Sequence, residues 1–419
     1  MELKPKIGEL PEGWRTTQLR DQCDLISKGT TPTSIGKQFY DRGINFIKIE
    51  SIESDGQILE EKLAFIDKDT HNVLCRSQLR DKDILFSIAG ALGRVSLVTE
   101  KFLPANTNQA LAFIRLRNNS EIDHYYLFHY LNSTEIKKHI ELINVQGAQA
   151  NLSLENIRDF EIKYPTHSEQ RTISAALSDV DSLITTLDRL IAKKRDIKQA
   201  AMQELLTGKR RLPGFSGELS SVCLGELGSF SKGRGIKKDD VVASGIPCVR
   251  YGEIYTHYND YIREFHSFIS EEIAKESQQI RNGDLLFAGS GETAEEIGKC
   301  VAYLKDEEAY AGGDIVIFSP KKQNSMYLGY LMNHSSIIIQ KARMGQGDAV
   351  VHISAKNLAE LRLRLPPIDE QNAIATAFSD IDAEIATMET RREKIRALKQ
   401  GMTQELLTGR IRLVQGAEA

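Results

Sequence analysis

The chain has 419 residues, of which 41% are hydrophobic and 27% are charged. This length exceeds that of one hydrophobic core, and the composition is that of a globular protein rather than a disordered or fibrous one. The 54 basic and 58 acidic residues give a net charge of -4. That balance neither requires nor excludes nucleic acid, because basic residues can gather on one face.

Targeting segments and cysteine sites are not indicated. No run reaches the roughly 18 apolar residues of a membrane span, and the opening MELKPKIGEL lacks the apolar centre of a signal peptide. We therefore expect a cytoplasmic protein. The cysteines are scattered and never form a CxxC pair, so we expect no disulfide framework and no zinc site, but buried free thiols. They are Cys23, Cys75, Cys223, Cys248 and Cys300.

The sequence contains an internal repeat. The segment QELLTG that begins at Gln203 returns at Gln404, 201 positions later, and the same shift aligns Glu169-Gln170 with Glu370-Gln371. A repeat this long indicates a duplicated domain, since solenoid units recur every 20 to 50 residues or so. Two similar halves predict a pseudo-twofold molecule that meets its target at two places.

Each half begins with short apolar runs that are separated by glycine, asparagine and proline, which predict strands. The expected strands are 44–49, 84–88, 94–98 and 110–116 in the first half, and 247–251, 285–288, 300–304 and 314–318 in the second. Helices are expected at 123–138 and 325–343, which makes each unit mixed α and β. We expect the aromatic stripe of Tyr126, Phe128 and Tyr130 to pack in the core.

A long helix follows each globular unit. The helices enter after Pro165 and after Pro366-Pro367, and Gly208 and Gly409 stand where left-handed C-caps belong. Thr166 and Glu169 have the spacing of a capping box. The implied division is 1–165 and 213–366 for the globular domains, and 166–212 and 367–419 for the helices.

The apolar residues of the long helices alternate at spacings of three and four, which predicts a coiled-coil seam. If the halves are related by a twofold axis, the two helices pair antiparallel; pairing of each helix with another chain is the alternative. The seam weakens at Lys194, Lys198, Arg392 and Lys399. The seam residues are Ile173, Leu177, Val180, Ile184, Leu187, Ile191, Leu205, Ile374, Phe378, Ile381, Ile385, Met388, Met402 and Leu406.

No catalytic or metal-binding constellation stands out. The sequence has no GxxxxGK[ST] loop, no HExxH and no GxSxG. Asp55, Glu60 and Lys62 follow the acid-then-ExK order of some nucleases, but the second half has no equivalent. We therefore assign no catalytic residue.

Binding chemistry is instead concentrated in three pairs of loops. Residues 27–32 and 231–235 begin matching units, and their glycines could bring backbone N–H groups to a phosphate, although a solvated turn explains either loop alone. Residues 87–94 and 288–299 follow a shared strand but differ in length, as two readers of different base sequences would. Residues 146–151 and 345–352 offer amides that could pair with adenine, or form ordinary polar loops.

The candidate DNA-binding residues come from these loops and from the ends of neighbouring strands. In the first half they are Lys28, Gly29, Thr30, Thr31, Lys48, Ser87, Gly90, Arg94, Gln146, Gln149 and Asn151. In the second half they are Lys232, Gly233, Arg234, Arg250, Ser290, Gly291, Lys299, Gln346 and His352.

These motifs resemble the specificity subunit of type I restriction-modification systems. The resemblance rests on the opening LPEGW at 10–14, the KGTTP loop at 28–32, the Pro-x-x-x-Glu-Gln helix entries and the double QELLTG, and it covers essentially the whole chain. It implies an α+β architecture with two mixed α/β target-recognition domains and an antiparallel coiled coil of two conserved helices between them.

The resemblance also implies a division of labour. This chain would be a non-catalytic subunit that binds double-stranded DNA and carries no cofactor. Two modification subunits would bring S-adenosylmethionine and methylate adenine, and restriction subunits would use ATP and Mg²⁺ for translocation and cleavage.

The second half departs from the first at its beginning, where Ser220 to Leu224 stand in place of the GW opening, and the two long helices are far more alike than the two globular units. We therefore expect different half-sites and an asymmetric target. Two other functions remain open. One is a coiled-coil adaptor whose globular units bind peptides or proteins; the other is an enzyme with a dispersed site.

Overall fold

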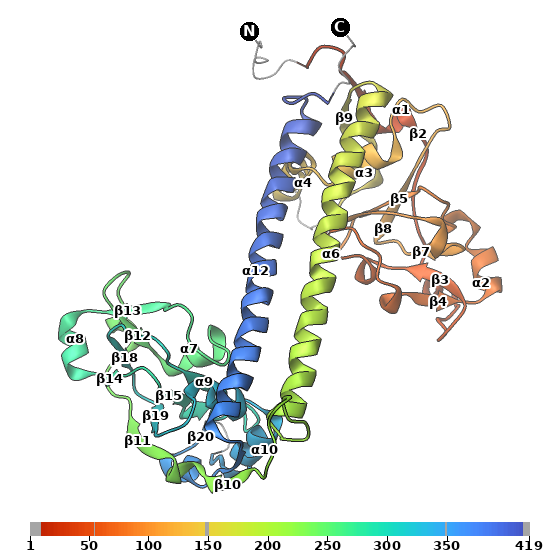
Figure 1. The fold of residues 1–419 in the computed structure, drawn as a ribbon. Coiled ribbons are helices and arrows are strands. Elements are labelled where there is room, and N and C mark those ends of the chain that lie inside the picture. The colour runs from red at the N-terminus through yellow and green to blue at the C-terminus, as the bar shows by residue number, and fades with distance from the viewer. Residues whose placement is uncertain (1–9, 54, 147–150, 348–349, 414–419) are drawn as a thin grey trace. The chain divides into compact units, whose positions relative to one another are not determined.

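The computed structural model describes residues 10–53, 55–146, 151–347 and 350–413. The chain forms two compact units, Met1–Asp188 with Arg391–Ala419, and Arg189–Thr390. The two long helices, α6 (His167–Leu205) and α12 (Ile368–Leu407), are labelled in Figure 1. The boundary between the units falls within each of them, after Asp188 and after Thr390. The observed division therefore runs through the helices, whereas the sequence-based division separated them from the globular parts.

Among its described residues, the first unit is built from nine strands, five complete α-helices and parts of α6 and α12. Its strands are β1 (Arg15–Gln18), β2 (Cys23–Lys28), β3 (Ile44–Ile47), β4 (Ala64–Ile66), β5 (Ile84–Ser87), β6 (Val95–Leu97), β7 (Ala105–Thr107), β8 (Leu111–Leu116) and β9 (Glu161–Tyr164). Its helices, besides α6 and α12, are α1 (Leu19–Gln22), α2 (Lys68–Val73), α3 (His124–Leu131), α4 (Thr134–Gln146) and α5 (Leu154–Arg158).

Two sheets and a helical layer make the core of the first unit. The sheet β2-β8-β5-β6 is antiparallel, and β3 lies between β4 and β7 in a second sheet. Ile84 and Phe86 of β5 face α3 and the start of α6, while Leu85 faces the second sheet, so the strand is buried on both sides. A strand covered on both faces reads as a continuous apolar run, which is why the sequence located it correctly.

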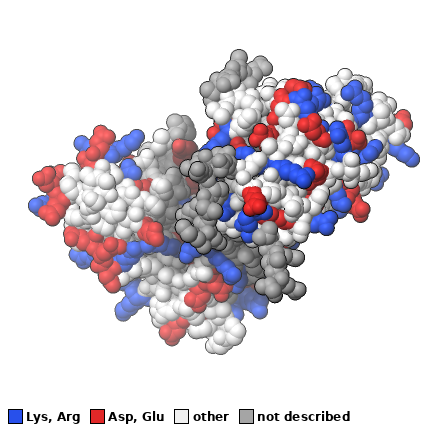
Figure 2. Space-filling view, turned by 90° about the horizontal axis from the view of Figure 1, so that it is seen from above, with Lys and Arg blue, Asp and Glu red and all other residues white. Residues whose placement is uncertain are grey.

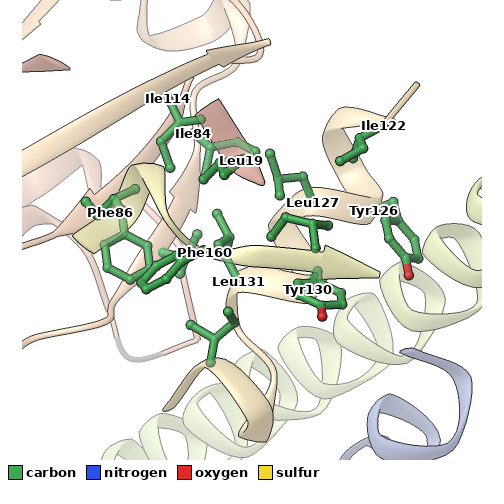
Figure 3. Close-up of a cluster of buried hydrophobic side chains, with 14 of the residues drawn as sticks. Leu19, Ile84, Phe86, Ile114, Ile122, Tyr126, Leu127, Tyr130, Leu131 and Phe160 are labelled. Atoms are coloured by element: carbon green, nitrogen blue, oxygen red, sulfur yellow. The ribbon is translucent and has the colours of Figure 1, made fainter. Parts of the chain in front are cut away.

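Figure 3 shows this core from within. Side chains of β5, α3 and Phe160 interlock beside the long helix, and the Tyr126 and Tyr130 rings lie in the same cluster. Tyr126 and Tyr130 are fully buried, and their hydroxyls donate to the backbone oxygens of Lys163 and Glu161. The prediction that this aromatic stripe packs in the core is confirmed, with Phe128 packed against its edge.

The second unit repeats this plan. Its strands are β10 (Ser220–Cys223), β11 (Gly228–Lys232), β12 (Ile246–Val249), β13 (Ser267–Ile269), β14 (Gln278–Ile280), β15 (Leu285–Ala288), β16 (Ser290–Gly291), β17 (Cys300–Ala302), β18 (Ala309–Ala311), β19 (Ile315–Pro320), β20 (Val351–His352) and β21 (Arg362–Leu365). Its other helices are α7 (Tyr251–Thr256), α8 (Glu271–Glu276), α9 (Ser325–Met332), α10 (Ser335–Met344) and α11 (Ala355–Ala359). The sheet β11-β19-β15-β17 matches β2-β8-β5-β6, and β13-β12-β18-β14 matches the second sheet with one more strand.

All eight expected strands are present with small shifts at their ends, but the expected helices 123–138 and 325–343 are each two helices. The break falls at Asn132-Ser133 in the first unit and at Asn333-His334 in the second. The Asn132 side-chain amide donates to the Phe128 oxygen, and the His334 ring accepts from the Ser336 N–H. These side chains bond backbone groups that have no partner within their own helix at its end. The apolar pattern of the sequence continues across both breaks and so does not indicate them.

The long helices pair antiparallel within each unit. In the first unit Asp181 bonds Lys399 at 2.5 Å and Asp188 bonds Arg392 at 2.9 Å. In the second unit Lys198 bonds Asp382 at 2.9 Å, and Lys194 bonds Glu384. The cations that weaken the predicted seam therefore form ion pairs across the two helices.

The seam residues are all buried or half-buried, but the helix ends do more than pair with each other. Ile173, Leu177 and Leu406 belong to the core of the first unit, and Ile374 and Phe378 belong to that of the second. The remaining buried seam residues are Ile184, Leu187, Ile191 and Ile385, and the half-buried ones are Val180, Leu205, Ile381, Met388 and Met402. The prediction that the seam residues bury only against the other long helix was thus incomplete. At each end of the seam, some of them also pack in the core of a globular unit.

The glycine caps are confirmed, and the capping box is only half formed. Gly208 and Gly409 have φ of 69° and 68°, the left-handed conformation that ends a helix. The Glu169 N–H donates to the Thr166 hydroxyl at 3.5 Å, but the Glu169 carboxylate does not return to residue 166. It accepts two hydrogen bonds from Arg412, each 2.7 Å long.

The same ion pair occurs in the second unit, where Arg211 holds Glu370 in a bidentate contact. Both glutamates have side chains that are only 1% exposed. The remaining guanidinium nitrogen donates to the Glu12 oxygen in the first unit and to the Gly217 oxygen in the second. Each arginine thus joins the start of one long helix to the first segment of its unit.

This geometry corrects the comparison of the two openings. Strand β10 pairs with β21 as β1 pairs with β9, so Ser220 is the counterpart of Arg15 and not of the GW opening. A Cβ at Gly409 would touch the Trp14 ring, and a Cβ at Gly208 would touch Leu219. Leu219 therefore takes the place of Trp14 against the helix-capping glycine.

The cysteine prediction holds for three of the five thiols. Cys23, Cys248 and Cys300 are buried, whereas Cys75 is exposed and Cys223 is half-buried.

None of the helices in the described part of the chain combines the length and hydrophobicity that a bilayer crossing needs.

Replacing Arg211 with Met should lower the free energy of unfolding of the second unit by about 3 kcal/mol, because it leaves the Glu370 carboxylate buried without its cation. Arg410→Met is the matched control, since Arg410 forms an exposed pair with Glu405 and should cost under about 1 kcal/mol. Urea unfolding of the full chain measures both. Equal effects of the two substitutions would show that the buried pair has no special weight.

His129 predicts an acid-sensitive first unit. Burial lowers the pKa of its ring to about 3, and its Nε2 lies 3.0 Å from the Ser178 hydroxyl of α6. The unfolded chain binds a proton at this ring below about pH 6.5 while the folded chain does not, so stability is lost as pH falls through that value, by about 2 kcal/mol at pH 5. Unfolding from pH 7.5 to 5 should therefore be less pH-dependent in His129→Gln than in the wild type; identical slopes would exclude this cause.

Candidate nucleic-acid interface

In the first unit, the sheet topology brings three candidate loops to one edge. Lys28 at the end of β2 is opposite Ala112, and Ser87 at the end of β5 is opposite Leu111, so both strands end at the start of β8. The Thr30 N–H donates to the Thr107 oxygen of β7, and β7 runs parallel to β3, which Lys48 follows. The loops after β2, β3 and β5 therefore emerge together.

The second unit has the same arrangement. Lys232 is opposite Val316 and Ala288 is opposite Ile315, at the start of β19. The Arg234 N–H donates to the Ala311 oxygen of β18, the strand parallel to β12, and Arg250 follows β12. Segments far apart in the sequence are thus joined into one surface per unit.

The glycines of the first loop pair have a structural role rather than the expected one. The Gly29 N–H donates to the Asn108 oxygen at 3.0 Å and the Gly233 N–H to the Ile315 oxygen at 2.9 Å. A Cβ would lie 1.9 Å from the Thr107 oxygen at Gly29 and 2.1 Å from the Gly312 oxygen at Gly233. The interpretation that these N–H groups approach a phosphate is wrong, because they are already bonded and glycine is needed for close backbone passage.

The side chains around these glycines are accessible. Lys28, Lys232 and Arg234 are exposed, and no described residue accepts a hydrogen bond from their side chains. The Thr31 hydroxyl donates to the Gln109 side chain, a partner that the sequence did not indicate. The free cations make these loops suited to phosphate contact through charge instead of through the backbone.

The second loop pair is tied back to the third in both units. The Leu152 N–H donates to the Ile88 oxygen and the Ile353 N–H to the Gly289 oxygen, each at 2.9 Å. Ala89 also bridges Asn151, and Ser290 pairs with His352. Asn151 and His352 are exposed beside these loops, while the Gln146 side chain and Gln149 lie outside the described residues.

A cavity of about 490 Å³ collects several candidate residues of the second unit. Lys232, Ser290, Gln346 and His352 all line it, and the Ser290 hydroxyl lies 2.9 Å from His352 Nδ1. The contact fixes the ring so that Nε2 is directed away from Ser290. The second unit therefore presents a cation, an amide and an imidazole around one hollow.

Other candidate side chains already have partners inside the protein. The Lys299 amine donates to the Tyr258 oxygen at 2.7 Å, and burial lowers its pKa. Arg250 bonds Glu253 at 2.9 Å, and the Arg94 guanidinium donates to the Ile52 oxygen at 2.7 Å. The Lys48 amine lies over the Phe39 ring, 5.5 Å from its centre.

The remaining candidates divide into buried and open positions. Ser87 is buried and its hydroxyl bonds within its own loop, whereas Gly90 is exposed with φ of 76° and open space around it. Gly291 lies beside the Tyr255 hydroxyl, which donates to the Ser290 oxygen. Tyr255 is a supporting residue that no sequence pattern singled out.

Neither the charges on the face shown in Figure 2 nor the potential metal ligands among the described residues single out another site. Figure 2 shows lysine and arginine interspersed with acidic side chains on the face it displays. Among the residues that the structure describes, no three histidine, cysteine, aspartate or glutamate side chains are grouped to hold a metal ion.

Comparison with known families gives a match along both halves. The family model described as the type I restriction modification DNA specificity domain matches residues 11–194 and again residues 217–397.

Individual relatives agree with this match. The chain is 26% identical to the putative type I restriction enzyme MjaX specificity subunit of Methanocaldococcus jannaschii, over 98% of this chain and 96% of that protein. It is 23% identical to the MjaVIII specificity subunit of the same organism, over 96% and 94%. The solved type I restriction-modification S subunit from M. genitalium has a similar fold, with a TM-score of 0.61 at 15% identity over 97% of this chain and 99% of that one.

The exposed lysines allow a direct test of the interface. Lys28→Gln and Lys232→Gln should each reduce the slope of log K against log salt by about 0.9, the contribution of one phosphate contact. The measurement is binding of the full chain to a random-sequence duplex across a salt series. Lys321→Gln, an exposed lysine after β19, is the control; unchanged slopes in the two loop variants would remove these loops from the interface.

Proposed function

Because the chain belongs to the type I restriction modification DNA specificity family, we propose that it reads a bipartite DNA target, one half-site with each unit. The observation that carries this proposal is the shared strand frame, which presents loops at matching positions in both units. Two units that share their strands but differ in their loops are suited to binding two different base sequences of DNA. The full target is then asymmetric.

The loops differ in ways that matter for base recognition. Ser87 of the first unit is Ala288 in the second, and the loop that follows extends over 88–94 in one and 289–299 in the other. His352 and Gln346 offer an imidazole and an amide beside the second loop. Amides and imidazoles can bond base edges, whereas Lys28 and Lys232 are suited to phosphates.

The relatives are specificity subunits, and among the described residues no three histidine, cysteine, aspartate or glutamate side chains are grouped to hold a metal ion. We therefore propose that methyl transfer and cleavage reside in modification and restriction subunits that assemble with this chain. S-adenosylmethionine would be bound by the former, ATP and Mg²⁺ by the latter. Because the target is cellular DNA, the complex would act in the cytoplasm.

An adaptor that binds only peptides or proteins is the weaker interpretation, because the matching family is defined by DNA specificity. The antiparallel helices then hold the two readers and present outer faces to the other subunits.

Reconstitution tests the division of labour. The chain alone should transfer no methyl group to DNA, and addition of its modification subunits should produce methylation at one bipartite, asymmetric sequence. Sequencing of the methylated positions in plasmid DNA reads out both results, with the modification subunits alone as control. Methyl transfer by the isolated chain, or methylation without sequence preference in the complex, would contradict the proposal.

A further inference from the structure

The two units fix their recognition loops by different means. In the first unit, the loop between β5 and β6 is closed by Ser87, which is fully buried. Its hydroxyl accepts from the Arg94 N–H at 2.8 Å and donates to the Ala91 oxygen. One side chain thus joins the start of the loop to its middle and its end.

The second unit lacks this hydroxyl, because Ala288 stands in the place of Ser87. Its loop between β15 and β17 is also longer. The loop is attached near its beginning, where the Tyr255 hydroxyl donates to the Ser290 oxygen at 3.1 Å. Its end is closed by the same backbone bond as in the first unit, since the Gly298 N–H donates to the Ala288 oxygen at 3.2 Å, but the side-chain attachment that Ser87 makes is missing.

Lys341 of α10 supplies that attachment. Its side chain is 1% exposed, and its amine donates to the Gly298 oxygen at 2.6 Å. Gly298 has φ of 69°, and a Cβ there would lie 3.1 Å from Lys341 Cδ. The lysine stem and amine therefore hold the turn at the end of the loop.

The corresponding position of the first unit is apolar. Ile140 of α4 lies against Gly93, which has φ of 75°, and a Cβ on Gly93 would lie 2.8 Å from Ile140 Cδ1. An isoleucine thus suffices where Ser87 closes the loop. A buried lysine is costly, and the Lys341 amine bonds a backbone oxygen rather than a carboxylate. The contact with the Gly298 oxygen compensates part of that cost.

We infer that Lys341 is a positioning residue for DNA recognition by the second unit, acting through the Gly298 oxygen to fix the loop 289–299. Ser87 has the equivalent role in the first unit. This inference rests on the proposed function, since it concerns how each half-site is read. The inference assigns Lys341 and Ser87 to different half-sites. A substitution of either residue should therefore affect one half-site only, whereas a general effect on folding would affect both.

The experiment uses the full chain in complex with its modification subunits. After the wild-type site has been determined, methylation kinetics are measured on the cognate duplex and on duplexes with one base changed in either half-site. Lys341→Ile, which installs the residue of the first unit, should raise KM for the cognate duplex about tenfold, as expected for loss of one charged hydrogen bond, with kcat within about twofold. Discrimination at one half-site should fall by a similar factor and remain unchanged at the other.

Ser87→Ala should produce the converse result and relax only the half-site that Lys341→Ile leaves intact. Lys321→Met is the matched control for loss of a lysine and should behave as the wild type. Lys341→Met keeps a long unbranched stem, so it provides the same test if the isoleucine variant does not fold.

The outcomes separate the two levels of the argument. A wild-type complex that methylates no bipartite site overturns the proposed function. If the wild type is specific, but a folded Lys341 variant discriminates both half-sites normally or relaxes both equally, Lys341 is not the positioning residue inferred here.

Discussion

The buried pairs Glu169–Arg412 and Glu370–Arg211 are the constraint on which the rest of each unit depends. Each carboxylate sits at the start of a long helix with almost no contact with water, and each arginine comes from the segment after the end of the other long helix. A buried carboxylate is tolerated only when a cation and good geometry compensate its lost hydration. The pair therefore fixes where one helix begins relative to where the other ends, within a single unit.

The neighbouring glutamine extends this constraint to the globular part. Gln170 accepts from the Asp123 N–H and donates to the Pro165 oxygen, which joins the helix entry to the start of α3. Gln371 makes the same contacts with Asn324 and Pro366. The repeated Glu-Gln pair is thus a joint between helix and sheet layers, and the loops at the far edge of the sheet can vary without disturbing it.

The sequence predicted what depends on local pattern and on the repeat. Strands such as β15 and the ends of α6 and α12 followed from apolar runs, proline entries and capping glycines. The breaks before α4 and α10 were missed because the apolar pattern continues across Asn132 and Asn333. The role of Gly29 could not be inferred either, since it depends on the Thr107 oxygen, which lies almost 80 residues away in the chain.

The candidate site was predicted as a set of loops but not as a surface with assigned roles. Lys28, Lys232 and His352 are exposed as expected, whereas Lys299 and Arg250 have internal partners. The sequence alone does not show whether a lysine or arginine side chain is exposed and able to contact DNA or is bonded to another group of the protein. Lys341 shows the reverse case, because a charged residue within an apolar helical stripe becomes meaningful only when its contact with Gly298 is seen.

The ion pairs between the long helices also explain why duplicated helices pair antiparallel. Because the helices are copies, a parallel pairing in register would set Asp181 beside Asp382 and Lys198 beside Lys399, with like charges opposed. The antiparallel pairing instead joins Asp181 to Lys399 and Lys198 to Asp382. A uniformly apolar seam would not distinguish the two alignments, whereas charged positions penalise the wrong one. The charged residues within the seam therefore reduce the hydrophobic area buried between α6 and α12, but they favour a single direction and register of helix pairing.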